Sequence, residues 1–160
     1  MRHHLYAASI FLAIVATSLA QDRQRPCPTP QASKDDKYVA GQIWSYKTRP
    51  EESASTITIL RVESLEKLGT VVHVRINDVH LKNCQGTSEL NMIAHAPFAR
   101  DAIDRSVSRR LKSESELPNF KEGYEAWRSA CGGAYTISIA EMLDVVEKTY
   151  QTGSGCATQK

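Results

Sequence analysis

The sequence predicts an α+β fold, with an antiparallel meander of four or five strands followed by about three covering helices. Two observations predict it. Residues 41–82 are rich in β-branched and aromatic residues, and turn-forming residues interrupt them at strand-length intervals. From residue 97 onward, apolar residues recur every three or four positions, which is typical of amphipathic helices.

Alternation of apolar and polar residues defines the strands, since successive side chains of a strand point to opposite faces. In the first strand this alternation places Trp44 and Tyr46 on one face. Pro50 and its polar neighbours then provide a turn. The strands are expected at 42–47, 55–63, 70–76, 79–82 and 88–95, with the least regular alternation in the last.

The segment Asn77-Asp78 decides how the middle of the sheet is connected. A two-residue hairpin turn there would keep Val79 and Leu81 on the same face as Ile76. A strand running straight through would turn both side chains to the opposite face. The sequence favours the hairpin, and a β-bulge is the other way to restore the phase.

Three helices are expected after the strands. Pro97 suits the first position of a helix that ends by Ser113. Asn119 and Glu122 form a capping-box pattern for a second helix, and Ser138 and Glu141 form one for a third. The stripes of these helices are Phe98, Ile103, Val107 and Leu111; Phe120, Tyr124, Trp127 and Cys131; and Ile139, Met142, Val146 and Tyr150.

Aromatic side chains suggest how the helices meet the sheet. The Trp44 and Tyr46 face and the face of the second helix are both too apolar to leave in water. A sheet followed by helices buries such faces together. We therefore expect Trp44 and Tyr46 to pack against Phe120, Tyr124 and Trp127.

The first twenty residues have the features of a cleaved secretory signal. A short basic start precedes an apolar run, and small residues stand three and one positions before Gln21. A retained anchor is the competing interpretation, but the run is shorter than the roughly 20 residues that span a bilayer. We expect a periplasmic or secreted protein with no membrane span after cleavage. The expected organisation is a signal (1–20), a mobile proline-rich leader (21–40), one α+β domain (41–150) and a flexible tail (151–160).

Net charge excludes two classes of partner. The chain carries a formal charge of +2, and removal of Arg2 with the signal leaves +1. A nearly neutral protein has no general electrostatic reason to bind nucleic acid or an anionic membrane.

Four cysteines remain after cleavage, and an even number in an oxidising compartment predicts disulfides. Three connectivities are possible. Cys84 and Cys131 both belong to the expected packed region, so we predict that they pair, with Cys27 and Cys156 either bonded to each other or free. Zinc sites use closely spaced cysteine pairs, and this chain has none, so no metal or other cofactor is expected.

Three stretches carry a resemblance: GQIWSYKTRPEESASTITILRVE (41–63), LGTVVHVRI (68–76) and HAPFARDAIDRSV (95–107). They resemble a family of small exported bacterial proteins of unknown function whose domain begins with a GQ[IV]WSYKTRP-like strand. The likeness covers roughly residues 41–150. It implies export and one compact domain, and it brings no catalytic residues.

Histidines are the starting point for any catalytic hypothesis. His73 and His80 are expected on an exposed face of the sheet. His95 precedes a helix containing Asp101 and Asp104, and a histidine with a carboxylate could support a small hydrolase. No G-x-S-x-G motif occurs between a strand and a helix. The leading interpretation is a non-enzymatic binding or envelope-interaction module whose partner is an unidentified envelope or extracellular protein or ligand.

Overall fold

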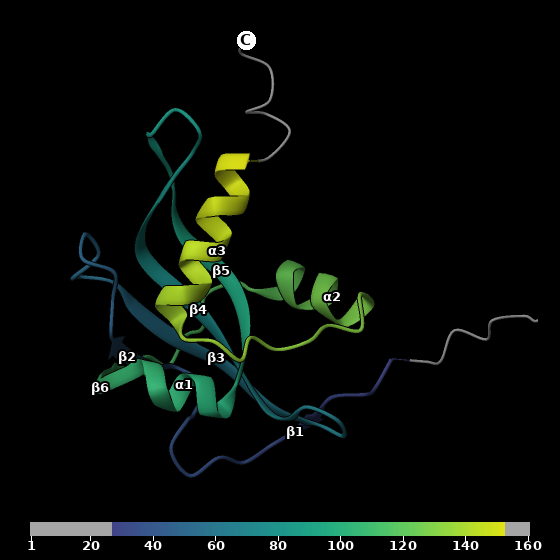
Figure 1. Cartoon of the computed structure of the whole chain (residues 1–160). Coiled ribbons are helices and arrows are strands. Elements are labelled where there is room, and N and C mark those ends of the chain that lie inside the picture. Colours follow the sequence, from purple (N-terminus) through teal and green to yellow (C-terminus); the bar gives the residue numbers. More distant parts are fainter. Residues whose placement is uncertain (1–26, 153–160) are drawn as a thin grey trace, which may run out of the picture.

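A computed structural model describes residues 27–152, apart from the side chains of Ser88 and Glu89 (Figure 1). Its centre is an antiparallel sheet in the order β5-β4-β3-β2-β6, with β1 paired to β3. The α+β class, the meander β2-β3-β4-β5 and three helices are as predicted. The strands are β1 (Gln31–Ala32), β2 (Gln42–Tyr46), β3 (Thr56–Leu65), β4 (Gly69–Lys82), β5 (Ser88–Ala99) and β6 (Val107–Ser113), and the helices are α1 (Arg100–Ser106), α2 (Lys121–Ser129) and α3 (Ile139–Thr152).

Two helices, α1 and α3, cover one face of the sheet (Figure 1). Their apolar side chains meet alternate residues of the central strands. As predicted, Ser138 and Glu141 form a capping box, because the Ser138 N–H donates to Glu141 Oε2 (2.8 Å) and the Glu141 N–H donates to Ser138 Oγ (3.3 Å). The buried core on this face includes Ile57, Ile59, Val72, Val74, Ile76, Phe98, Ile103, Ile139, Met142 and Leu143.

Strand β4 shows that the predicted hairpin at Asn77-Asp78 is wrong. The strand runs without a break to Lys82, and the alternative of a β-bulge is confirmed. The register against β5 shifts between Asn77 and Leu81, and Asp78 has a φ of 54°. Asp78, in the left-handed region, is the extra residue of the bulge. It restores the alternation of the strand, so Val79 and Leu81 stay on the core face.

The predicted helix from Pro97 to Ser113 is also wrong in extent. Pro97 still lies in β5, opposite His73, and only Arg100–Ser106 is helical. Residues 107–113 form β6, which pairs antiparallel with the free edge of β2. Backbone hydrogen bonds to an open strand edge therefore outweigh the helical spacing of the apolar residues.

Helix α2 covers part of the opposite face, so the predicted packing of its aromatic residues on Trp44 and Tyr46 is wrong. Tyr46 belongs to the core under α1 and α3, with Trp44 packed against it. Tyr124 and Trp127 instead contact His73, whose neighbours Val72 and Val74 point to the other side. Both aromatic sets are buried or half-buried, but on different faces of the sheet.

The leader is packed against the domain where the structure describes it, which corrects the expectation of a mobile segment. Residues Gln31 and Ala32 pair with β3. Asp35 accepts from Arg100 Nε at 2.7 Å, and Tyr38 is only 1% exposed. Residues 1–26, with the predicted signal, and 153–160, with most of the predicted tail, lie outside the described residues.

Cys131 is bonded to Cys27, so the predicted pairing of Cys84 with Cys131 is wrong. Cys84 is itself disulfide-bonded, and Cys156 lies outside the described residues. The prediction failed because it treated the leader as loose. The leader in fact returns to the end of α2, where the Cα atoms of Cys27 and Cys131 are 4.9 Å apart.

Candidate functional site

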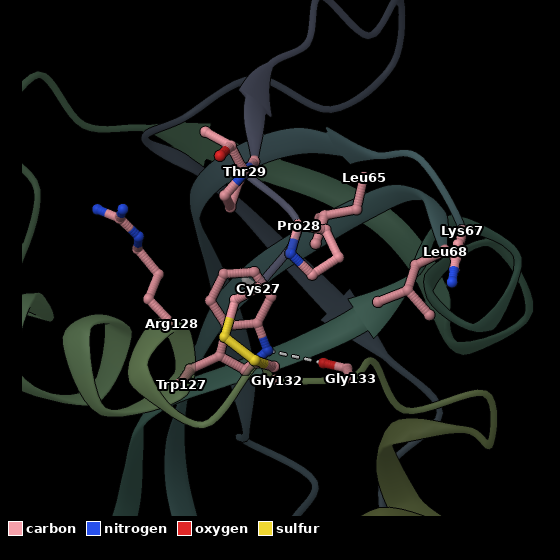
Figure 2. Close-up of a pocket in the computed structure, with 12 residues that line it drawn as sticks. Cys27, Pro28, Thr29, Leu65, Lys67, Leu68, Trp127, Arg128, Gly132 and Gly133 are labelled. Atoms are coloured by element: carbon pink, nitrogen blue, oxygen red, sulfur yellow. Dashed lines mark hydrogen bonds between the residues drawn. A yellow bond between two sulfur atoms is a disulfide. The ribbon is translucent and has the colours of Figure 1, made fainter. Parts of the chain in front are cut away.

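A cavity of about 260 Å³ opens beside the Cys27–Cys131 disulfide (Figure 2). Three segments distant in sequence enclose it: the leader, the turn between β3 and β4, and the end of α2. We call it the Trp127 pocket. Its lining residues are Cys27, Pro28, Thr29, Pro30, Leu65, Lys67, Leu68, Trp127, Arg128, Cys131, Gly132 and Gly133.

The end of α2 holds the disulfide in place. The N–H of Cys131 donates to the carbonyl of Arg128, and the N–H of Gly132 donates to that of Trp127, which is the hydrogen-bond pattern of a Schellman motif. Cys131 occupies the left-handed position with a φ of 50°. The chain therefore reverses at the cysteine, which joins the helix end to the leader.

Trp127 forms a fixed wall of the pocket. Its indole Nε1 donates to the carbonyl of Gly133 at 2.7 Å (Figure 2). A Cβ atom at Gly132 would collide with the indole ring, whereas one at Gly133 would meet nothing within 4 Å. Glycine is thus required at position 132 for the ring to lie where it does.

Most of the lining is apolar, yet its charged members share one sign. Of the described residues that line the Trp127 pocket, only Lys67 and Arg128 are charged, and neither forms an ion pair with another described residue. Figure 2 places them on opposite sides of the pocket, with Lys67 beside Leu68. Leu68 is 42% exposed, a large fraction for a leucine. An apolar hollow between two free cations suits a small ligand with an apolar body.

A buried polar cluster stands behind Trp127. The His73 ring lies edge-on to the indole with 4.6 Å between their centroids, and it is fully buried. The carboxylate of Glu63 accepts from Tyr124 Oη at 2.8 and 2.9 Å and forms an ion pair with Arg61, whose Nε lies 2.6 Å from Glu63 Oε1. We call Arg61, Glu63, His73, His95 and Tyr124 the His73 cluster.

Two histidines extend this cluster towards the surface. His73 Nδ1 lies 2.9 Å from His95 Nε2, and the rings are stacked. His73 Nε2 lies 3.3 Å from Glu63 Oε2 without the alignment of a hydrogen bond. If His73 Nε2 were unprotonated, its lone pair would face the negatively charged carboxylate of Glu63, which is unfavourable. We therefore place the proton of neutral His73 on Nε2. His73 Nδ1 then accepts from His95, and His95 Nδ1 remains an acceptor.

Burial keeps both histidines neutral. Desolvation, reinforced by His95 and Arg61, lowers the pKa of His73 to about 3. Desolvation also lowers the pKa of His95. Burial, with the hydrogen bond to Glu63, raises the pKa of Tyr124. The expectation that His73 is a surface histidine is therefore wrong, while His80 is exposed as expected.

The structure separates the residues of the predicted hydrolase site. His95 stands in the His73 cluster under α2, whereas Asp101 and Asp104 belong to α1. Asp104 accepts from Lys37 Nζ and Tyr38 Oη, both at 2.7 Å, and from Arg100 at 2.6 Å. Within the described part of the chain, the carboxylate that His95 approaches, through His73, is Glu63.

Two further hollows are polar. Arg49, Glu52, His80 and Glu147 line one near the end of α3, where Arg49 forms ion pairs with both Glu52 and Glu147. A wider groove lies between β3, β4 and residues 111–118. Among residues 27–152 there is no group of three or more His, Cys, Asp or Glu suited to a metal ion, and no helix there is long and apolar enough to cross a membrane.

Sequence reasoning missed the pocket because its walls come from segments that carry no motif. Pro28 and Pro30 are typical of a mobile leader, and Leu68 falls in an expected loop. The pair Gly132-Gly133 was the available signal, since two consecutive glycines after an aromatic helix indicate a close approach as well as a helix end.

No family model matches this chain, and comparisons with curated proteins and with solved structures found no match.

Proposed function

We propose that this chain is an exported, non-enzymatic binding module that takes a small, largely apolar ligand into the Trp127 pocket. The observation that carries the proposal is the pocket itself, an apolar cavity walled by Trp127 and closed by a disulfide between the leader and α2. A cavity containing an aromatic wall and few polar groups is the usual form of a small-ligand site.

Disulfide bonding supports export to the periplasm or the extracellular space. Bonded cysteines persist in oxidising compartments, and the cytosol keeps thiols reduced. The signal-like residues 1–20 and the likeness to small exported bacterial proteins point the same way. Intact-mass measurement of the exported protein tests this part, because cleavage before Gln21 should remove Met1.

The size of the cavity limits the ligand. At about 260 Å³ it lies just below the roughly 300–1,000 Å³ of sites for drug-sized molecules. A bicyclic ring or a short aliphatic chain is therefore the size of body that the pocket can enclose.

Fluorescence of Trp127 provides the test. In a Trp44→Phe background, Trp127 is the sole tryptophan, and a neutral probe, 2-naphthylmethanol, should change its emission saturably with 1:1 stoichiometry. Leu68→Glu places a charge in the apolar wall and should weaken binding by at least about tenfold. Leu90→Glu is the matched control, since Leu90 is 40% exposed on β5 and does not line the pocket.

A probe that leaves the emission unchanged would contradict the proposal. Equal weakening by Leu68→Glu and Leu90→Glu would also contradict it, because the binding site would then lie elsewhere.

A hydrolase acting through His95 is the second candidate, and the chain Glu63–His73–His95 is the observation in its favour. His73 lies within hydrogen-bond distance of His95 and can orient its ring as the partner of a general base does, while Glu63 lies 3.3 Å from His73 Nε2 without a hydrogen bond. Ester hydrolysis that His95→Gln abolishes without changing stability would support it. Unchanged hydrolysis in that variant would exclude His95 as the base.

A further inference from the structure

Resting on the proposed function, we infer that the ligand of the Trp127 pocket is an organic anion, with a compact apolar body in the hollow and a carboxylate at the rim, where Lys67 and Arg128 supply positive charge. The charged groups of the lining carry the inference. Both are cations, and the described lining contains no carboxylate to neutralise either of them.

Of the fourteen other lysines and arginines among residues 27–152, six form ion pairs. Lys37, Arg49, Arg61, Lys82, Arg100 and Lys112 each form an ion pair of 3.3 Å or less. Lys67 and Arg128 form none with the described residues, although Glu66 is adjacent to Lys67 in sequence. Glu66 lines an adjoining hollow with Gln31 and Ser64, and this hollow shares Pro28 and Thr29 with the Trp127 pocket. No ion pair with a described carboxylate therefore offsets the positive charge of the Trp127 pocket lining.

Geometry assigns the two parts of the ligand to different places. The indole of Trp127, Pro28 and the side chains of Leu65 and Leu68 form the enclosed part (Figure 2). Lys67 and Arg128 are both exposed, so their charged ends lie at the rim in contact with water. An apolar body enters the hollow while its carboxylate stays at the rim, which avoids burial of an unpaired charge.

Two probes that differ only in charge test the inference. Isothermal titration of the full mature chain with 2-naphthoate and with 2-naphthylmethanol compares a carboxylate with a neutral alcohol on the same ring. We expect 2-naphthoate to bind roughly five- to tenfold more tightly at low salt, since exposed ion pairs are individually weak. This advantage should shrink as salt is added, because salt screens exposed charges.

Substitutions distinguish the contribution of the cations at the rim to binding from that of the apolar hollow. The double variant Lys67→Gln, Arg128→Gln should reduce the affinity for 2-naphthoate to that for 2-naphthylmethanol and leave the latter unchanged. Lys148→Gln is the matched control, because Lys148 is an exposed lysine on α3 outside the pocket.

The outcomes distinguish this inference from the proposed function. Equal affinity for the two probes, with no effect of the double variant, would overturn the anion preference and leave a neutral binding site. Absence of binding for both probes would overturn the proposed function, and the inference with it.

Discussion

At the scale of single residues, Gly132 decides whether Trp127 can form the pocket wall. Gly132→Ala should displace the indole, because a Cβ atom at this position would collide with the ring. We expect a loss of about 1 to 3 kcal/mol in the free energy of unfolding and a loss of probe binding. Denaturant titration and Trp127 fluorescence measure the two effects.

Gly133→Ala is the control for this prediction, since the space around that position is open. Its stability and probe binding should stay close to those of the unmodified protein. Similar losses in both variants would mean that chain flexibility, and not the close contact with the indole, explains the two glycines.

His73 should make the protein less stable as the pH falls. Its pKa in the folded state is about 3, below the ordinary value of 6.5, so the unfolded chain binds more protons between these values. Neutral His73 makes its full contribution to the free energy of unfolding above about pH 6.5. As the pH falls from there towards 3, this free energy decreases by up to about 1.4 kcal/mol per pH unit. His95, whose pKa is also lowered by burial, acts in the same direction.

Denaturant titrations between pH 4.5 and 7.5 measure this slope. Carboxylates with lowered pKa values, such as Glu52, also make the protein less stable in acid. Comparison of the unmodified protein with the His73→Asn variant therefore isolates the effect of the histidine. The variant should be less stable at pH 7.5 and should show a shallower slope. An unchanged slope would show that His73 can be protonated without cost in the folded protein.

At the scale of elements, the bulge in β4 depends on Asp78. A residue with a φ of 54° is tolerable for Asp or Asn and strained for a β-branched side chain. Asp78→Val should therefore reduce the free energy of unfolding by roughly 1 to 2 kcal/mol, whereas Asp78→Asn should be nearly neutral. Thermal unfolding of the two variants checks the difference, and equal stability would contradict the strain.

The strands were predictable because apolar and polar residues alternate along each of them, and this alternation is visible in the local sequence. The sequence showed that Val79 and Leu81 belong with Ile76, and it offered a bulge as one solution. The choice between bulge and hairpin depended on whether β4 continues alongside β5, which local residues do not record. For the same reason β6 was assigned to a helix, since its partner β2 lies more than sixty residues earlier.

The candidate site was less predictable than the fold. His95 was identified from its position before a helix, but its contact with His73 follows from the register of β4 against β5. The aromatic face of α2 was recognised correctly as a buried surface, yet the face of the sheet that it covers depends on where the chain crosses over. Two sides of a sheet are equally available to an amphipathic helix until the connections are known.

At the scale of the whole molecule, the Cys27–Cys131 disulfide ties the first described residue to the end of α2. It spans 104 residues of sequence, and a loop of about 100 residues corresponds to roughly 4.7 kcal/mol in the chain-entropy model. The usual total for a domain is about 5 to 15 kcal/mol. The bond is therefore expected to be a major part of the stability, and it also fixes the leader that walls the pocket.

The double variant Cys27→Ser, Cys131→Ser tests both roles and is cleaner than a reducing agent, which would also reduce the disulfide of Cys84. We expect the free energy of unfolding to fall by several kcal/mol, up to about 5, and probe binding to be lost even under conditions where the domain stays folded. Peptide mapping without reduction should first recover Cys27 joined to Cys131. Retained probe binding in a folded double variant would show that β1 and the contact of Asp35 with Arg100 are enough to hold the leader wall in place.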